Sequence, residues 1–276
     1  MLVDVRLCVT AIEKISVGLE HPLWVGYYSA TIRRFTCMAT FLWGPENQLI
    51  VPTPDPAFLM HDDDSGRCQM YRVGVPELPI IHWAAQKFGN PEKKMLDCGA
   101  HMGAYSLILS DHFKEVHAFE AQQRSYYQLC GNIFINEKTN IIPHHRAVTN
   151  LTESNQVMTL NIVSEDGGGS TLRQPQENQK VLKQEKVKTV TIDHYHFDHV
   201  GLIKLDIEGN ELKALHGARF TLERNDYPPI IFEANNDTWY EKEKQELFGH
   251  LMGLNYQIIE IRPFNNMYAA VRPEPQ

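Results

Sequence analysis

The chain has no apolar stretch long enough to cross a membrane. None of its 276 residues falls in an unbroken run of the roughly 18 apolar residues that a transmembrane helix needs. The first seven residues carry Asp4 and Arg6 inside their apolar stretch, so they lack the basic-then-apolar order of a signal peptide. We therefore expect no membrane span and no secretory leader.

Paired cysteines are also missing. The five cysteines are an odd number and none of them forms a C-x-x-C motif, which excludes a disulfide scaffold and the usual zinc clusters. Free thiols in a reducing compartment are the simplest interpretation, so a cytoplasmic location is expected. The cysteines are Cys8, Cys37, Cys68, Cys98 and Cys130.

Positive charge is scarce. The chain has 26 lysine and arginine residues against 34 aspartate and glutamate residues, which gives a net charge of −8. Such a chain has no broad positive field for a phosphate backbone, so no nucleic-acid partner is expected. The hydrophobic share of 43% and charged share of 22% are ordinary for a globular protein with its own core.

The first part of the chain differs in composition from the rest. Up to about residue 75, dense aromatic residues and short strand-like runs are broken by prolines and glycines, as at 35–43 and 48–51. We interpret 1–75 as a small β-rich N-terminal extension, with a substrate or interface role, and 76–276 as the main domain. Aromatic residues of the extension, such as Trp24, Tyr28 and Trp43, either stack on a sugar or form a small core.

In the main domain, strand-like and helix-like segments alternate. This alternation predicts an α/β fold with a mostly parallel sheet covered by helices on both faces. The interval 151–188 interrupts the rhythm with a strand-like run at 157–163 and a loop at 165–171, and such insertions usually lie near the ligand crevice. Expected helices are 79–88, 104–111, 125–134, 210–223 and 239–252; expected strands are 95–98, 116–120, 140–148, 202–207 and 229–234, with a final hairpin of 256–261 and 267–271.

A glycine-containing turn after the first of these strands indicates a nucleotide-type site. Gly99 permits a sharp turn, and Gly103 lets the following helix begin close to a ligand. His101 stands where a dinucleotide fingerprint has its middle glycine. Asp97 ends the strand and is expected to point into the crevice. Glu120 follows 23 residues later, where an acid accepts the ribose hydroxyls. These residues predict an adenosine joined to an amino acid, as in S-adenosylmethionine.

Several segments resemble the FkbM family of S-adenosylmethionine-dependent methyltransferases. They are LDCGAHMGAYS at 96–106, AFE at 118–120, the helix at 129–136 and LIKLDIEGNE at 202–211, supported by GVPE at 74–77, TID at 191–193, HGA at 216–218 and IIFE at 230–233. The resemblance implies a class I methyltransferase, Rossmann-like, with seven strands and an antiparallel last hairpin. It also implies O-methylation, often of sugars or secondary metabolites.

The expected cofactor contacts follow from this resemblance and from position. Glu77 belongs to the segment ahead of the first strand, and Ala121 replaces the proline that usually follows the ribose acid. Arg146 and Ala147 follow His144 and His145 near the end of the third expected strand, where the adenine edge is expected. The full expected set is Glu77, Asp97, Gly99, His101, Gly103, Glu120, Ala121, Arg146 and Ala147.

The ends of two neighbouring strands carry the candidate catalytic groups. Strand alternation places Lys204 and Asp206 on one side together with Glu208, and Glu233 ends the next strand. A hydroxyl nucleophile must lose its proton, so a carboxylate base or a metal is needed. We predict catalytic roles for Lys204, Asp206 and Glu233. A structural Lys204–Asp206 ion pair with a helix cap near Asn235 is the alternative.

The same oxygen-bearing groups suit a hard cation. Asp206, Glu233 and Asn235 are predicted to hold Mg²⁺ or Mn²⁺, although the carboxylates alone could serve as the base. Three histidines, His194, His196 and His199, lack partners at zinc spacing and are interpreted as a polar connection. The acidic run at 62–64 is interpreted as a solvated loop.

The sequence therefore predicts an S-adenosylmethionine-dependent O-methyltransferase that acts on a sugar or glycan hydroxyl. One alternative is an NAD-linked oxidoreductase, against which His101 counts. The other is a non-catalytic module that binds the cofactor within a complex. The acceptor is expected to be a small molecule or saccharide, and its identity is left open. The oligomeric state is also left open, a homo-oligomer included.

Overall fold

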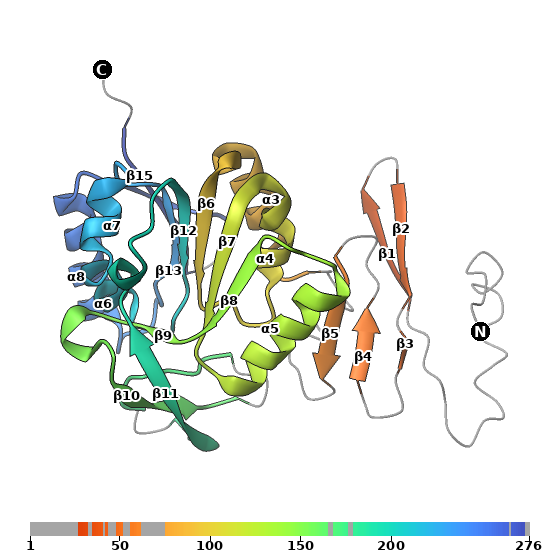
Figure 1. Cartoon of the computed structure of the whole chain (residues 1–276), viewed down its shortest axis with the longest axis horizontal. Coiled ribbons are helices and arrows are strands. Elements are labelled where there is room, and N and C mark those ends of the chain that lie inside the picture. The colour runs from red at the N-terminus through yellow and green to blue at the C-terminus, as the bar shows by residue number, and fades with distance from the viewer. Residues whose placement is uncertain are drawn as a thin grey trace, which may run out of the picture. The chain divides into compact units, whose positions relative to one another are not determined.

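The computed structural model describes residues 27–32, 35–40, 42–43, 48–51, 56–61, 75–164, 168–175, 179–264 and 266–273. The chain divides into two compact units, Met1–Gly74 and Val75–Gln276. Figure 1 labels the helices and strands of both units. Among the described residues, no helix combines the length and the apolar character that a membrane span requires.

The N-terminal unit is built from short antiparallel strands. β1 (Tyr27–Ile32) and β2 (Phe35–Thr40) form a hairpin, and β3 (Leu42–Trp43), β4 (Gln48–Val51) and β5 (Phe58–His61) form a three-stranded sheet. The described strands of this unit are short, and the interpretation of 1–75 as an extension with a substrate or interface role stays a prediction. The side chains of Tyr28 and Trp43 lie outside the described part of the structure, as do Trp24 and the acidic run at 62–64, so their predicted roles stay predictions.

The second unit is centred on a seven-stranded sheet in the order β14-β15-β13-β12-β6-β7-β8. All neighbouring pairs from β13 to β8 are parallel, whereas β15 runs antiparallel to both β13 and β14. This is the class I methyltransferase arrangement, and the prediction is confirmed. The strands are β6 (Asn90–Cys98), β7 (Phe113–Glu120), β8 (Ile141–His145), β12 (Val200–Leu205), β13 (Ile230–Glu233), β14 (Gln257–Glu260) and β15 (Met267–Val271).

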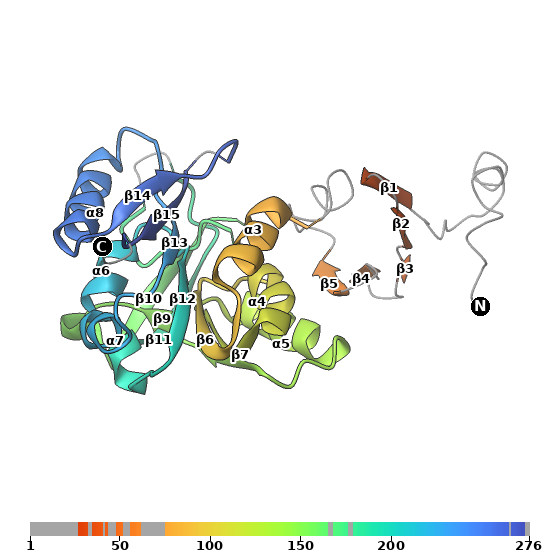
Figure 2. The same ribbon diagram turned by 90° about the horizontal axis from the view of Figure 1, so that it is seen from above.

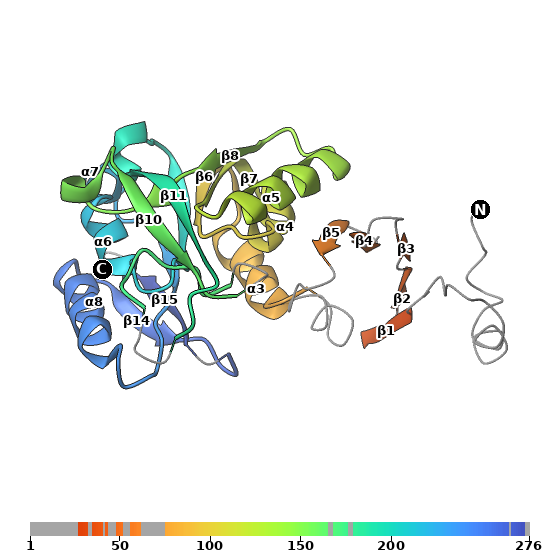
Figure 3. The same ribbon diagram turned by 90° about the horizontal axis from the view of Figure 1, so that it is seen from below.

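Helices cover both faces of the sheet, as Figures 2 and 3 show from opposite sides. On one face lie α3 (Leu78–Phe88), α4 (Ala104–Leu109) with the 3₁₀ turn η2 (Ser110–His112), and α5 (Gln123–Ile135). On the other face lie α6 (Glu211–His216), α7 (Arg219–Arg224) and α8 (Glu241–Gly253). The central strand β12 is buried along its whole length, because both of its faces pack against helices or their connections.

The single helix predicted for 210–223 is wrong, since the structure has two short helices there. Gly217 lies at the break, and a Cβ there would lie 2.2 Å from the backbone oxygen of Thr149, so the close approach of the two segments requires glycine. Asp193 then caps the second helix, because its Oδ1 accepts hydrogen bonds from the amide (2.7 Å) and the hydroxyl of Thr221. Tertiary contacts therefore end α6 at His216 and begin α7 at Arg219.

The third strand predicted for 140–148 is also divided. β8 ends at His145, and β9 (Ala147–Val148) joins a separate sheet in the order β10-β11-β9. The other two strands belong to the insertion: β10 (Val157–Ile162), which was predicted, and β11 (Lys183–Val190), which was not. β11 is mostly polar and exposed, so its sequence lacks the apolar alternation that signals a strand.

Candidate active site

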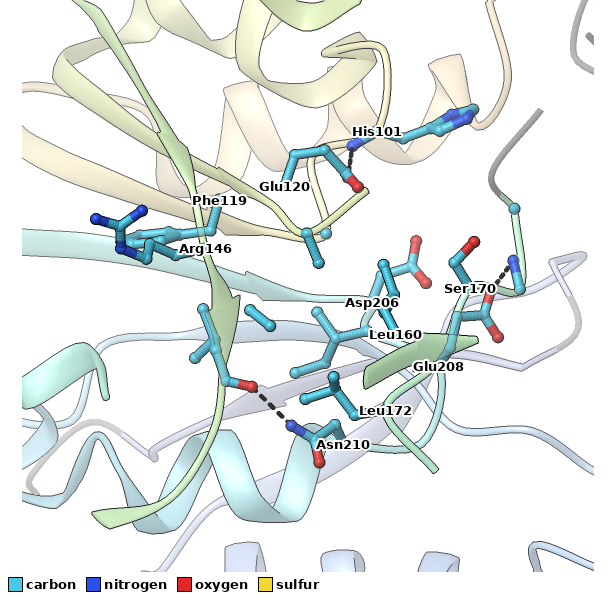
Figure 4. A pocket seen from close by; sticks show the side chains of 17 residues that line it. His101, Phe119, Glu120, Arg146, Leu160, Ser170, Leu172, Asp206, Glu208 and Asn210 are labelled. Atoms are coloured by element: carbon cyan, nitrogen blue, oxygen red, sulfur yellow. Dashed lines mark hydrogen bonds between the residues drawn. The ribbon is translucent and has the colours of Figure 1, made fainter. Parts of the chain in front are cut away.

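A pocket opens at the carboxyl ends of β6, β7 and β12 and is closed on one side by the insertion (Figure 4). Of the predicted cofactor residues, Gly99, His101, Glu120, Ala121, Arg146 and Ala147 line it, and so does Asp206 from the predicted catalytic set. Glu77, Asp97 and Gly103 do not line the pocket. Its other lining residues are Phe119, Val148, Leu160, Gly168, Gly169, Ser170, Leu172, Ile207, Glu208 and Asn210.

The turn after β6 has a backbone shape that only glycine tolerates at its first position. Gly99 has a φ of +82°, and a Cβ there would lie 1.7 Å from the backbone oxygen of Asp206. The amides of Gly99 and Ala100 both donate to the carbonyl of Phe119 at 2.9 Å. The turn is therefore fixed against β7 on one side and against the end of β12 on the other, which brings the predicted cofactor turn and Asp206 together.

Glu120 is held in place by backbone amides. Its Oε2 accepts from the amide of His101 and its Oε1 accepts from the amide of Gln122, both at 2.8 Å. Burial raises the pKa of Glu120, an effect opposed by His101 and by these two amides. Each carboxylate oxygen retains a lone pair, so the group can accept two further hydrogen bonds from a diol such as a ribose. This placement fits the predicted cofactor.

An apolar slot lies beside Glu120. Phe119 contributes one part of it, and Leu160 and Leu172 from the insertion contribute another (Figure 4). Arg146 at its edge donates from Nη1 to the carbonyl of His145 at 2.7 Å, which fixes its side chain. A flat aromatic base would lose its hydration readily in such surroundings. The slot and Glu120 together suit an adenosine.

Lys204 contacts the turn and the two neighbouring acidic residues, Asp97 and Asp206. Its Nζ donates to the carbonyl of Gly99 at 2.8 Å and lies 3.1 Å from Asp206 Oδ2 and 3.7 Å from Asp97 Oδ1. Burial alone would lower the pKa of Lys204, but Asp206 and Asp97 raise it above its ordinary value. Lys204 is therefore charged, and the ion pair with Asp206 that was considered as the structural alternative is present.

Asp97 is completely buried. Its Oδ2 accepts from the hydroxyl of Ser106 at 2.6 Å, and burial raises its pKa. The structure places this side chain behind the pocket wall rather than in the crevice into which it was predicted to point. Asp97 faces Lys204, which lies between it and Asp206.

Three carboxyl groups gather where β12 and β13 end. One oxygen of each of Asp206, Glu208 and Glu233 lies within 4.8 Å of the others. Burial, followed by the charges of Asp206 and Glu211, raises the pKa of Glu208 to about 7. Burial and the nearby Asp206 also raise the pKa of Glu233. Such a set of hard oxygen donors fits a divalent cation, and each acid also fits a proton acceptor.

The predicted metal ligand Asn235 already accepts a hydrogen bond from the backbone. Its Oδ1 accepts from the amide of Asp237 at 2.8 Å, so it stabilises the turn that leads to α8. Glu208, which was not in the predicted metal set, is the third carboxyl of the group. The strand ends at Leu205, and Glu208 has a φ of +55°, so strand alternation does not govern where this side chain points.

A family model described as the methyltransferase FkbM domain matches residues 97–263, which is more than half of the chain. The chain belongs to the FkbM methyltransferase family. The predicted family and fold are thereby confirmed, and the protein is an S-adenosylmethionine-dependent methyltransferase. The alternative of an NAD-linked oxidoreductase is wrong, because the matched domain is a methyltransferase domain.

Several solved structures are similar to this FkbM protein at low identity. An rRNA methylase from Streptococcus thermophilus is 13% identical with a TM-score of 0.44, over 72% of this chain and 95% of the other. SMU.1697c, a putative methyltransferase from Streptococcus mutans in complex with SAH, is 12% identical with a TM-score of 0.45, over 71% and 95%. A precorrin-6y C5,15-methyltransferase from Geobacter metallireducens is 9% identical with a TM-score of 0.45, over 72% and 90%. No curated protein matches the chain.

Apart from His101, the described histidines of the FkbM domain do not line the pocket. His194 is in the 3₁₀ turn η4 (Ile192–Tyr195), and neither it nor His196 or His199 lines the pocket. His144 stacks on Phe119, with ring centroids 4.5 Å apart, and burial lowers its pKa to about 4. His144 is therefore neutral near pH 7 and supports the pocket wall from behind.

Sequence reasoning expected the insertion near the ligand crevice but missed which of its residues line the pocket of this methyltransferase. Leu160 is buried and belongs to a small cluster with Ile162 and Val187, so the apolar spacing within β10 was an available signal. Leu172 and Ser170 lie in an irregular loop, and no local pattern marks them. Their place depends on Thr171, whose amide and carbonyl pair with those of Asn161.

Proposed function

We propose that this FkbM methyltransferase transfers a methyl group to a hydroxyl oxygen of a saccharide. The observation that carries the proposal is the group of three carboxyls at the crevice edge, beside the turn fitted for the cofactor. A sugar hydroxyl is a weak acid, so transfer to it requires a group that takes up its proton. The saccharide class rests on the tendency of the family named in the sequence analysis.

Each part of the site has a proposed task. Glu120 accepts the ribose hydroxyls, and the slot formed by Phe119, Leu160 and Leu172 holds the adenine. When bound, S-adenosylmethionine supplies a methyl group activated by a sulfonium. Asp206 takes the proton from the acceptor oxygen, and Lys204 fixes the carboxylate of Asp206 at 3.1 Å. The acceptor oxygen must also be aligned with the methyl group of the cofactor, and the walls of the crevice provide this alignment.

Screening would test the proposed reaction directly. Glycans, methyl glycosides and activated sugar precursors are incubated with the full chain and methyl-labelled cofactor, and label transfer is followed by mass spectrometry. We expect transfer to an oxygen of at least one saccharide. Transfer only to nitrogen, sulfur or carbon acceptors in a parallel panel would contradict the proposal.

The proposal also includes the predicted cytoplasmic location. The described cysteines Cys98 and Cys130 are free thiols, which agrees with a reducing compartment.

Glu120→Ala is expected to weaken cofactor binding. The change removes the acceptor for the ribose hydroxyls, at a cost of roughly 1–3 kcal/mol. S-adenosylhomocysteine should raise the melting temperature of the wild-type protein by mass action on the folded state, and the variant should show a smaller shift at equal ligand concentration. Calorimetric titration measures the same loss as a dissociation constant. Unchanged affinity would remove Glu120 from the cofactor site.

A divalent cation is expected to support the transfer. Asp206, Glu208 and Glu233 supply three oxygen ligands, with Glu208 in the place first predicted for Asn235. Bound Mg²⁺ or Mn²⁺ would lower the pKa of the acceptor hydroxyl and relieve repulsion among the carboxylates. Activity should fall on chelation and return with the metal, and Glu233→Gln should raise the metal concentration required. If chelated enzyme remains fully active, the carboxylates act without a metal.

A further inference from the structure

The insertion carries a hydroxyl group without a partner on the wall of the pocket. Ser170 lines the pocket, and its Oγ is buried but forms no hydrogen bond with any of the described residues. Figure 4 shows Ser170 on the same side of the pocket as Glu208. A buried hydroxyl that lacks a partner is uncommon and calls for one. Nothing in the proposed reaction uses Ser170.

The backbone of Ser170 is fixed through its two neighbours. The amide of Gly169 donates to Oε1 of Glu208, and the hydroxyl of Thr171 donates to the backbone oxygen of Glu208, both at 2.9 Å. Thr171 also pairs with Asn161 through its amide (3.0 Å) and its carbonyl (2.9 Å). Contacts within the chain therefore hold Ser170 beside one of the three carboxyls, so a ligand that binds there meets a preorganised group.

A tryptophan lies at the surface near this segment, outside the pocket. Trp239 belongs to the connection that follows Glu233, and 38% of it is exposed. Single exposed apolar residues are common, so exposure alone gives Trp239 no role. Its ring is also fixed, because Nε1 donates to Oδ2 of Asp237 at 3.1 Å and the guanidinium of Arg173 lies 4.9 Å from the ring centroid. A fixed, exposed indole offers a ligand a flat surface at little cost in conformational freedom.

Arg173 links this tryptophan to the carboxyls. A Cβ at Gly209 would lie 2.7 Å from Cδ and Nη1 of Arg173, so this side chain packs on the residue that follows Glu208. Its guanidinium contacts Trp239, and its backbone lies three residues after Ser170. The unpaired hydroxyl and the exposed indole therefore flank the turn at Glu208. The acceptor oxygen has to lie near this turn if the carboxyls are to take up its proton.

We propose that Ser170 and Trp239 form the subsite that binds a pyranose ring of the acceptor. The ring stacks on the indole of Trp239, and the hydroxyl of Ser170 forms a hydrogen bond with an oxygen of the acceptor. A pyranose suits both groups, because its axial C–H groups form an apolar face that the electron-rich face of an indole attracts, whereas its hydroxyls lie at the rim. An apolar ligand would leave Ser170 unpaired. The inference rests on the proposed function, since it names the residues that bind the saccharide.

Binding of simple glycosides tests the subsite without requiring methyl transfer. The full chain is saturated with S-adenosylhomocysteine and titrated with the methyl pyranosides of glucose, galactose, mannose, fucose, rhamnose and glucuronic acid, followed by saturation-transfer NMR. Sorbitol serves as a polyol without a ring. We expect at least one pyranoside to bind and sorbitol not to bind. Trp239→Ala should lower the affinity for that pyranoside about tenfold, and Ser170→Ala about fivefold.

Matched variants separate recognition from a structural role. Trp239→Phe retains an aromatic ring and should lower the affinity only about threefold. Trp83→Phe makes the same change in a tryptophan of α3 that packs edge-on against Phe88, and it should leave pyranoside binding unchanged. The affinity for S-adenosylhomocysteine should stay close to that of the wild type in every variant, because the proposed subsite binds the acceptor and not the cofactor.

Three results would overturn the inference. Pyranoside binding that is unaffected by Trp239→Ala and Ser170→Ala would place the saccharide elsewhere. Absence of binding by every pyranoside in the panel would show that the subsite does not take this class of ligand. A joint loss of affinity for pyranoside and S-adenosylhomocysteine would assign both residues to the shape of the site.

The proposed reaction can fail separately from the subsite. Selective loss of pyranoside binding in the variants, with methyl transfer only to acceptors other than saccharides, would retain the subsite and overturn the proposed acceptor. Transfer to a saccharide oxygen at the wild-type rate by Trp239→Ala and Ser170→Ala, over a range of acceptor concentrations, would retain the acceptor and overturn the subsite.

Discussion

Gly99→Ala is expected to destabilise the second unit by more than about 3 kcal/mol. The Cβ would lie 1.7 Å from the backbone oxygen of Asp206, and the residue would have to retain a φ of +82°. No flexible side chain can move aside to relieve this contact, because the oxygen belongs to the backbone of Asp206 and the Cβ is fixed by the backbone of residue 99. Either the turn changes shape or β6 and β12 separate at this edge. Cofactor binding should be lost with the stability.

Denaturant unfolding and titration with S-adenosylhomocysteine measure the two effects. Gly249→Ala is a matched control, since Gly249 lies inside α8 and a Cβ there meets no atom within 4 Å. That change should stabilise the helix by about 0.5–1 kcal/mol, because alanine loses less backbone freedom than glycine. A Gly99→Ala protein with normal stability and normal affinity would show that the turn does not need glycine.

Asp206→Asn is expected to lower turnover by about 10²-fold or more. The substitution retains the shape of the side chain but removes the charge that would accept a proton or hold a metal. Asp206 lines the pocket and belongs to the group with Glu208 and Glu233, so the loss should appear in methyl transfer rather than in folding. The affinity for S-adenosylhomocysteine should change much less than the turnover.

The ion pair with Lys204 supplies the competing explanation for Asp206. If the carboxylate serves only to balance Lys204, Asp206→Asn should lower the melting temperature while turnover with a saccharide acceptor remains close to normal. Glu243→Gln is a suitable control, because Glu243 forms an ion pair with Arg173 and does not line the pocket. A full-rate Asp206→Asn enzyme would contradict the catalytic assignment.

The alternation of strand-like and helix-like segments was sufficient to predict a mostly parallel sheet covered by helices. β12 and β13 are short, mainly apolar runs, and β6 and β7 are buried over their C-terminal parts. A parallel sheet is the arrangement that buries such segments on both faces. The positions of Gly99 and Glu120 at the ends of two of these strands could be predicted for the same reason. Carboxyl ends of parallel strands meet at one edge, so strand-end residues come together without further information.

Contacts between segments far apart in the chain decided the rest. Whether 210–223 forms one helix or two depends on Thr149 and Asp193, and no local pattern in that segment reveals them. The carboxyl group of Glu208 is placed by the amide of Gly169 at 2.9 Å, across 39 residues of sequence. Local sequence predicts helices and strands that have strong periodicity, and it predicts which chemical groups lie at the ends of the strands. Side-chain placement in irregular loops depends on non-local packing, and only the tertiary structure determines it.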